Sequence, residues 1–241
     1  MKCPGQDLRL WKPGDIFDVS CPQCEGKIEF FKDEVRRRCK SCGAQVTNPK
    51  IDFGCAQWCA YAEQCLGNLP PEIREKRREF LKDRIAGEMR KVFESDSKHV
   101  DHANRVARFA EEILKAEGGD PVVVIAASYL HDIGIHEAQR KYKSTAGEYQ
   151  EREGPPLARN ILERLGLEKD TIDEVCDLIA HHHSPGRIKT LNFQILWEAD
   201  SLVNGEDASD EEREEIQRVV ETTFRTATGK MLAKNLFPGD G

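Results

Sequence analysis

The chain has 241 residues with a formal net charge of −7, and charged residues make up 33% of it. No apolar run approaches the ~20 residues that a membrane-spanning helix needs, and the first residues lack the apolar core of a signal peptide, so we expect a cytoplasmic protein without membrane contact. The acidic total argues against broad nucleic-acid binding, and the length leaves room for one domain with a small appendage.

Eight of the nine cysteines lie in the first 65 residues, which favours metal binding over disulfides in a cytosolic chain. Four of them form two C-x2-C pairs separated by fourteen residues: Cys21, Cys24, Cys39 and Cys42. Each pair points two thiolates at one ion, and four thiolates leave no open position, so we predict a structural Zn²⁺ site. The segment 27–38 between the pairs is predicted to form a short hairpin, and the whole pattern resembles a zinc ribbon.

A second set of cysteines is predicted to hold another metal. Cys55 and Cys59 are four residues apart and share one face if the segment is helical, and Cys65 and Cys3 complete a set of four thiolates. Such a set suits either a second zinc ion or an iron–sulfur cluster. The alternative is that these small side chains pack in a core without a metal.

The rest of the chain is predicted to be helical, so the fold class is mainly α, with a cysteine-rich module over residues 1–69 and a helical domain over residues 70–241. Apolar residues spaced three and four apart predict the helices, and Gly, Pro and capping residues predict their ends. The predicted helices cover 72–92, a segment from 95–97 to 117, 122–130, 157–165, 169–182, 191–204 and 210–226. The polar stretch 136–156, with Pro155 and Pro156, is predicted to be a long loop with some helical content.

His131 and Asp132 stand side by side at the end of the apolar segment 122–130. We predict that this segment is a buried helix that Asp120-Pro121 begins, although its β-branched residues would also suit a strand. An imidazole and a carboxylate at such a point suit a divalent first-row metal. Two more candidate donors, His102 and Asp200, lie on other predicted helices. Two nitrogen and two oxygen donors that converge in a helical bundle form a coherent site for Mn, Co, Fe, Ni or Zn.

This order of His, His-Asp and Asp resembles the HD-domain superfamily of metal-dependent phosphohydrolases over roughly residues 95–205. The motifs that carry the resemblance are His102-x-x-Arg-Val, Leu-His-Asp-Ile-Gly at 130–134, Ile-x-x-His ending at His182, and Ala-Asp-x-Leu at 199–202. The resemblance implies an all-α bundle with the metal in its middle. The core ligands that it implies are His102, His131, Asp132 and Asp200.

The dinuclear branch of that superfamily uses further histidines for a second metal, usually including one between the HD pair and the later histidine segment. That interval here contains only His136, four residues after the pair, which argues against a second metal. The side chains near the expected position are instead Gln150, Glu151 and Glu153. His182 and His183 are candidate ligands near the site, although successive helical residues point ~100° apart and cannot all face one ion. His99 competes with His102, which the Arg-Val spacing favours.

The chemistry that the resemblance implies is hydrolysis by metal-activated water, because a bound ion lowers the pKa of water toward ~7. Asp132 is a ligand at the reacting centre, and Glu137 and His136 are candidates for proton transfer. Candidate contacts for substrate phosphate are Arg105, Arg140 and Lys141, although the run at 140–143 reads equally well as a solvated charged surface.

The function that we favour from the sequence is a phosphohydrolase acting on a nucleotide or another small phosphate ester. Two other functions stay open. Some superfamily members are diiron oxygenases, and the extra histidines allow that reaction. In the third reading the helical domain senses a nucleotide without catalysis, and the ribbon with its basic run at 36–38 binds nucleic acid or a protein partner.

Overall fold

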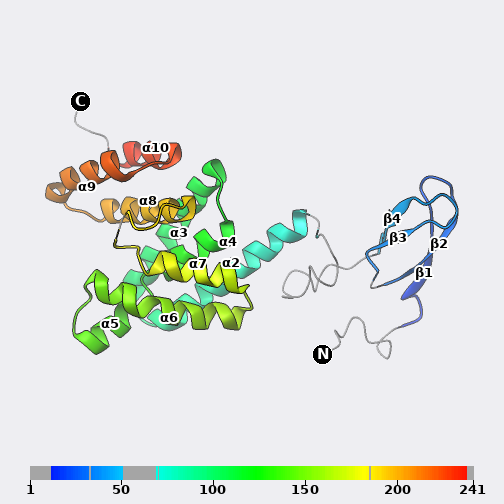
Figure 1. The fold of residues 1–241 in the computed structure, drawn as a ribbon, viewed down its shortest axis with the longest axis horizontal. Coiled ribbons are helices and arrows are strands. Elements are labelled where there is room, and N and C mark those ends of the chain that lie inside the picture. The colour runs from blue at the N-terminus through cyan, green and yellow to red at the C-terminus, as the bar shows by residue number, and fades with distance from the viewer. Residues whose placement is uncertain (1–11, 33, 51–68, 70, 185, 238–241) are drawn as a thin grey trace. The chain divides into compact units, whose positions relative to one another are not determined.

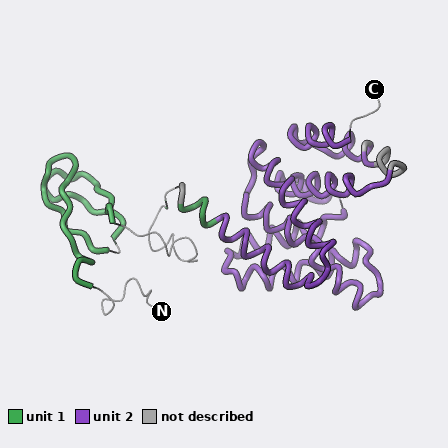
Figure 2. Tube along the Cα trace, turned by 180° about the vertical axis from the view of Figure 1, so that it is seen from behind, with its two compact units in different colours: residues 1–77 green, residues 78–241 purple. Residues whose placement is uncertain are grey.

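The computed structural model describes residues 12–32, 34–50, 69, 71–184 and 186–237. The chain divides into two compact units, residues 1–77 and residues 78–241, which are described separately (Figure 2). The predicted second cysteine site lies outside the described residues, because it would use Cys3, Cys55, Cys59 and Cys65.

The N-terminal unit contains two antiparallel hairpins (Figure 1). Strand β1 (Ile16–Ser20) pairs with β2 (Lys27–Phe31), and β3 (Arg36–Arg38) pairs with β4 (Gln45–Thr47). The prediction of a single hairpin over 27–38 is therefore wrong in its pairing, although two strands do lie there. Each C-x2-C pair is itself the tight turn that reverses the chain, so each inner strand pairs with an outer strand.

The helical unit confirms the mainly α prediction, and no strand is found in it among the residues that the structure describes. The helices are α2 (Pro71–Phe93), α3 (Ser97–Glu117), α4 (Pro121–Leu130), α5 (Ile135–Tyr142), α6 (Gly147–Leu165), α7 (Lys169–Ile179), α8 (Leu191–Glu206), α9 (Asp210–Thr223) and α10 (Ala227–Leu236). Within the described residues, none of them is long and apolar enough to cross a bilayer.

Helix α4 forms the centre of this unit and lies against α3, α7 and α8. All its residues from Val123 to Leu130 are buried. Asp120 caps the helix, since its carboxylate accepts hydrogen bonds from the amides of Val122 (2.8 Å) and Val123 (3.2 Å), and Pro121 occupies the first position. The cap and the burial on all sides explain why β-branched residues form a helix here.

The loop predicted at 136–156 is wrong, because this stretch forms α5 and the first half of α6. Pro155 and Pro156 lie inside α6, where a proline costs about 3 kcal/mol relative to alanine in an isolated helix. Tertiary packing offsets that cost: α6 packs along α5 and α7, and the Cys176 thiol contacts the carbonyl oxygen of Pro155 at 3.5 Å. Helix α10 was also not predicted, and α7 ends at Ile179 rather than at residue 182.

A buried carboxylate ties the C-terminal helices to the core. Glu198 on α8 is 0% exposed and lies beside the turn between α9 and α10. One of its oxygens accepts hydrogen bonds from the side-chain amide of Gln194 (2.7 Å) and the backbone amides of Arg225 (2.6 Å) and Thr226 (3.0 Å). The other oxygen accepts from the Thr226 hydroxyl. The charge is therefore fully hydrogen-bonded where it is buried.

Candidate metal centre

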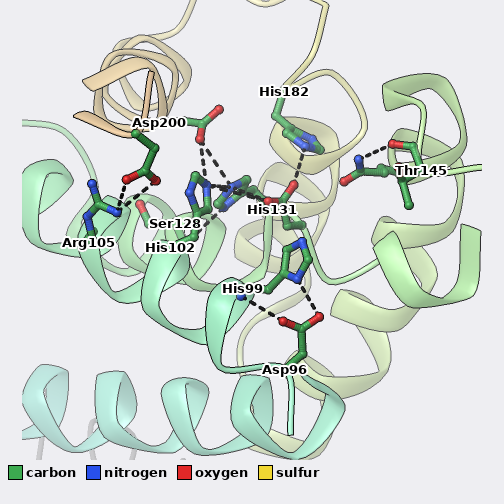
Figure 3. A network of polar contacts seen from close by, with 12 residues as sticks. Asp96, His99, His102, Arg105, Ser128, His131, Thr145, His182 and Asp200 are labelled. Atoms are coloured by element: carbon green, nitrogen blue, oxygen red, sulfur yellow. Dashed lines mark hydrogen bonds and ion pairs between the residues drawn. The ribbon is translucent and has the colours of Figure 1, made fainter. Parts of the chain in front are cut away.

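Three segments bring the four predicted core ligands together, and Figure 3 shows three of them, His102, His131 and Asp200, beside one another. Helix α3 carries His102, the turn after α4 carries His131 and Asp132, and α8 carries Asp200. These elements meet because α4 packs against both α3 and α8. His131 is 1% exposed, whereas the side chain of Asp132 keeps 16% exposure. Asp132 is therefore a candidate ligand that keeps an opening to solvent.

The ligand atoms lie at the separations expected around one cation. His102 Nε2 is 3.2 Å from His131 Nε2 and 3.0 Å from Asp200 Oδ1. Asp132 Oδ2 is 3.3 Å from His131 Nε2 and 3.7 Å from His102 Nε2. Ligands held about 2.0–2.2 Å from a first-row ion are separated by roughly 3.0–3.5 Å in tetrahedral or octahedral geometry. The donor set therefore fits a divalent ion.

A backbone carbonyl group on the side away from the other ligands fixes the tautomer of His131. Its Nδ1 donates a hydrogen bond to the carbonyl oxygen of Ser128 at 2.9 Å, so Nε2 faces the other ligands with its lone pair when the ring is neutral. His182 repeats this arrangement, because its Nδ1 donates to the carbonyl oxygen of Ile179 at 2.6 Å. His182 Nε2 is buried and, among the described residues, has no hydrogen-bond partner. An orphaned acceptor at this place fits a site that takes up a further atom.

The electrostatics of the cluster favour positive charge at its centre. Burial alone would lower the pKa of His131, but the carboxylates of Asp132 and Asp200 outweigh it and raise the pKa to about 9. Burial raises the pKa of Asp200, yet the hydrogen bond from His102 and the charge of His131 lower it overall. A proton on His131 Nε2 and a divalent cation would occupy the same space. The carboxylates thus attract a cation to the point where the ring nitrogens converge.

The family comparison agrees with this geometry. Residues 100–218 match the family model of the HD domain, and this span includes all four ligands. Residues 100–218 of the helical unit are an HD domain. HD domains bind divalent metals and form a superfamily of metal-dependent phosphohydrolases, so the resemblance seen in the sequence is confirmed. No curated protein and no solved structure showed a significant match to the chain. We call His102, His131, Asp132 and Asp200 the HD centre.

Two further histidines lie on the other side of the Asp132 carboxylate. Its second oxygen, Oδ1, is 3.4 Å from His182 Nε2, and one ligand atom each from Asp132, His182 and His183 lies within 4.8 Å of the others. The expectation that successive histidines diverge assumed a helix, but α7 ends before them and they lie in a turn. Glu151 on α6 holds that turn, because it accepts hydrogen bonds from the His183 amide (3.0 Å) and the Ser184 hydroxyl (3.1 Å).

The predicted proton-transfer residues point elsewhere in the HD domain. Glu137 binds Arg140 and Lys141, which lower its pKa to about 2. A carboxylate with so low a pKa is a weak general base at neutral pH. His136 Nε2 lies 2.9 Å from Asp96 Oδ2 and not beside the HD centre ligands. Neither residue is brought to Asp132 by a described contact.

The predicted phosphate contacts are paired with carboxylates in the structure. Arg105 binds Glu206 and Asp207 at 2.8 Å each, at the end of α8. Arg140 binds Glu137, and Lys141 binds Glu153 at 2.6 Å. Each cation would have to leave these partners to hold a phosphate, so their role in substrate binding stays a prediction.

Sequence reasoning missed the residues that support the HD centre from a distance. Glu151 had been considered only as a substitute ligand, and nothing in the sequence indicates that it holds the histidine turn. Gln150 is buried, and its side-chain amide donates to the carbonyl oxygen of Thr145 at 2.7 Å while its Oε1 lacks a partner. Polar residues in a helix interrupted by two prolines gave no periodic signal of this packing.

We expect Gly134→Ala to disturb the HD centre, because Gly134 follows the ligand pair directly. A Cβ atom there would lie 2.5 Å from the backbone nitrogen of Gly154 and 2.8 Å from the carbonyl oxygen of Gln150, and backbone atoms cannot rotate away. The free energy of unfolding should fall by about 1–3 kcal/mol, and metal affinity should fall with it. Urea denaturation and metal titration measure the two effects. Gly87→Ala on α2 is the matched control, since a Cβ there meets nothing within 4 Å and should not destabilise. Equal unfolding midpoints for Gly134→Ala and the wild type would contradict this packing.

The N-terminal unit holds the predicted four-thiolate cluster. The sulfur of Cys21 lies 3.6 Å from that of Cys42, and the sulfur of Cys24 lies 3.5 Å from that of Cys39. Backbone amides of Cys42 and Ser41 lower the pKa of Cys39 to about 6, which favours the thiolate. All four cysteines are free thiols with ligand atoms within 4.8 Å of one another. This cluster is consistent with a zinc-ribbon-like module.

We expect Cys39→Ser to remove one zinc ion per chain and to unfold both hairpins. The apolar cluster between the two hairpins is small, since among the residues that the structure describes it consists of Ile28, Phe30 and Val46 with two of the cysteines as its buried members. Such a core is too small to fold without the metal, so ligand loss removes most of the folding energy. Elemental analysis and amide dispersion in NMR spectra measure the result, and the helical circular dichroism signal serves as the internal control. Retention of zinc by Cys39→Ser would exclude the four-thiolate site.

Proposed function

We propose that the HD domain is a phosphohydrolase acting on a nucleotide or another small phosphate ester. The observation that carries this proposal is the HD centre, in which two imidazole nitrogens and two carboxylate oxygens converge at ligand spacing beside a partly exposed Asp132. When bound there, a divalent ion such as Mn, Co, Ni, Fe or Zn polarises a phosphoryl oxygen and lowers the pKa of water. His102, His131, Asp132 and Asp200 would hold that ion.

His182 supplies the protein's own proton acceptor in this proposal. Its Nδ1 proton is committed to the carbonyl oxygen of Ile179, so its buried Nε2 carries a lone pair 3.4 Å from Asp132 Oδ1. A water molecule hydrogen-bonded to this nitrogen would give up its proton to it as the water oxygen attacks phosphorus and the bond from phosphorus to the leaving oxygen breaks. Glu151 keeps the turn in place, so the base stays oriented. These atoms supply proton removal without Glu137 or His136.

The proposal is tested with the full chain loaded separately with each of the five metals. Nucleoside mono-, di- and triphosphates, cyclic dinucleotides and nitrophenyl phosphate esters are offered, and released phosphate and nucleotide products are measured by chromatography. We expect turnover of at least one phosphate ester, with loss of turnover in Asp200→Asn. No turnover of any substrate with any metal, or equal turnover by Asp200→Asn, would contradict the proposal.

One observation favours a second candidate function, a dinuclear oxygenase. His182 and His183 lie on the far side of Asp132 and offer ligands for a second ion. Anomalous scattering at the HD centre of crystals of the full chain separates the two readings. One ion there assigns His182 to proton transfer, and two iron atoms there with oxygen consumption would support the oxygenase.

The ribbon-like module is proposed as the contact to a nucleic acid or a protein partner. Strand β3 contributes Arg36 and Arg38, which are exposed and, two residues apart, lie on one face of the hairpin. Phosphate binding by these side chains would weaken as salt rises. Binding of the full chain to RNA and DNA is measured at several salt concentrations. If no binding is found, or if its affinity does not change with salt, a nucleic acid is excluded as the partner.

A further inference from the structure

A second group of metal-ligating side chains lies apart from the HD centre ligands. Asp96 precedes α3, His99 lies in its first turn, and His136 lies at the start of α5. A single carboxylate oxygen, Asp96 Oδ2, is 2.7 Å from His99 Nδ1 and 2.9 Å from His136 Nε2. Figure 3 shows His99 turned toward Asp96, while His102, one turn further along α3, faces Asp200. The two histidines of α3 thus serve different clusters.

The three ligand atoms are held in a defined place. The other oxygen of Asp96 accepts a hydrogen bond from the His99 amide at 3.2 Å and so caps α3. The ring of buried Phe93 stacks on the His99 ring, with centroids 5.6 Å apart, and lies edge-on to the His136 ring at the same distance. Both imidazoles are therefore oriented by an apolar wall, and the partly exposed His136 leaves an approach from solvent.

We propose that Asp96, His99 and His136 bind a second divalent cation of the Zn²⁺ class. Ligand atoms of all three lie within 4.8 Å of one another, and two imidazoles with one carboxylate form a donor set that zinc and its neighbours in the first row accept. Three protein ligands leave a position for water, as expected for an exchangeable site at a surface.

Two features set the strength of this site. The carboxylate is ionised throughout the neutral pH range, because the hydrogen bonds from His136 and His99 lower the pKa of Asp96 to about 2. Against this, the positive end of the α3 dipole disfavours a cation close to its first turn. With one carboxylate here and two in the HD centre, we expect weaker binding at Asp96 than at the HD centre.

The position of the ion gives it a structural consequence. His99 lies one turn before His102, and His136 lies four residues after Asp132. An ion between His99 and His136 links the start of α3 to the start of α5. It therefore restrains two of the three segments that carry the HD centre ligands, α3 and the turn before α5, without being part of that centre.

The experiment counts zinc ions per chain in the full protein. Wild type, His99→Asn and His136→Asn are dialysed against micromolar zinc and analysed for zinc and protein. His181→Asn is the matched control, because the polar contacts of His181 Nδ1 within the described part of the chain are to the carbonyl oxygen and carboxylate of Asp177. We expect His99→Asn and His136→Asn each to bind one zinc ion fewer than the wild type, and His181→Asn to bind the same number.

A second outcome would overturn the proposed site. If Asp96 merely caps α3 and accepts two histidine hydrogen bonds, all four proteins bind the same number of zinc ions, and the proposal is overturned. Circular dichroism of the variants shows whether they fold. Should either variant unfold, anomalous scattering from zinc-soaked crystals of the wild type decides, since a peak at the HD centre without one between Asp96, His99 and His136 also overturns it. Neither readout depends on turnover of a phosphate ester.

Discussion

Asp132→Asn is expected to lower kcat/KM for phosphate-ester hydrolysis by at least about 10³-fold. Its Oδ2 lies beside the HD centre histidines and its Oδ1 beside His182, so one carboxylate serves the ion and the proposed base together. Asparagine keeps the shape but removes the charge and one acceptor. Transition-state charge stabilisation of several kcal/mol is lost, and each 1.4 kcal/mol is worth about tenfold in rate.

The control for this prediction is Asp177→Asn. Asp177 lies on α7 four residues before His181, and its side chain is 60% exposed. Asp177→Asn also replaces a carboxylate by an amide, and it does so near the turn that carries His182 but away from the HD centre. Activity should therefore stay within about twofold of the wild type. Steady-state kinetics on the best substrate, with metal content measured in parallel, give the comparison. An Asp132→Asn protein with a tenth or more of wild-type activity would exclude Asp132 as a group essential for catalysis.

Glu198→Ala is expected to lower the free energy of unfolding by about 3–5 kcal/mol. The substitution leaves the Arg225 and Thr226 amides without their acceptor, and buried donors that lose a charged partner cost about 1–3 kcal/mol each. The cavity left by the side chain adds to this cost. Urea denaturation followed by circular dichroism measures the change.

Glu198→Gln separates the contribution of hydrogen bonding from that of volume. Glutamine fills the same space and keeps one acceptor, so we expect an intermediate loss, smaller than that of the alanine variant. Gly229→Ala should act in the same direction as the alanine variant, because a Cβ atom there would lie 2.0 Å from a carboxylate oxygen of Glu198. A Glu198→Ala protein within about 1 kcal/mol of wild type would show that the α9–α10 turn does not need the carboxylate.

The helical class and the meeting of the four candidate ligands were predictable because both depend on local patterns. Apolar residues at helical spacing mark α3 and α8, and the Asp120 cap followed by proline marks α4. The pair His131-Asp132 was visible because two ligands are adjacent in the chain. Its partners could be named in advance because the superfamily keeps their order.

The remaining features depend on contacts between residues far apart in sequence. The carboxylates that pair with Arg105 lie about a hundred residues away on α8, so a cation that looked free for phosphate is in fact neutralised. Helix α6 contains two prolines whose cost is offset only by packing on α5 and α7. The meeting of His99 with His136 likewise depends on how α5 folds back after the ligand turn. No local pattern encodes these contacts.

The hydrogen bonds from Nδ1 of His131 and of His182 to backbone carbonyl groups have a consequence for the order in which cation and substrate bind. Both rings donate Nδ1–H to carbonyl groups in the last turns of α4 and α7, so the negative ends of two helix dipoles point at the centre together with two carboxylates. Such a potential attracts a cation and repels a phosphate. The protein should therefore acquire affinity for an anionic substrate only after a cation has reversed the sign of the field, which makes binding sequential: cation first, phosphate second.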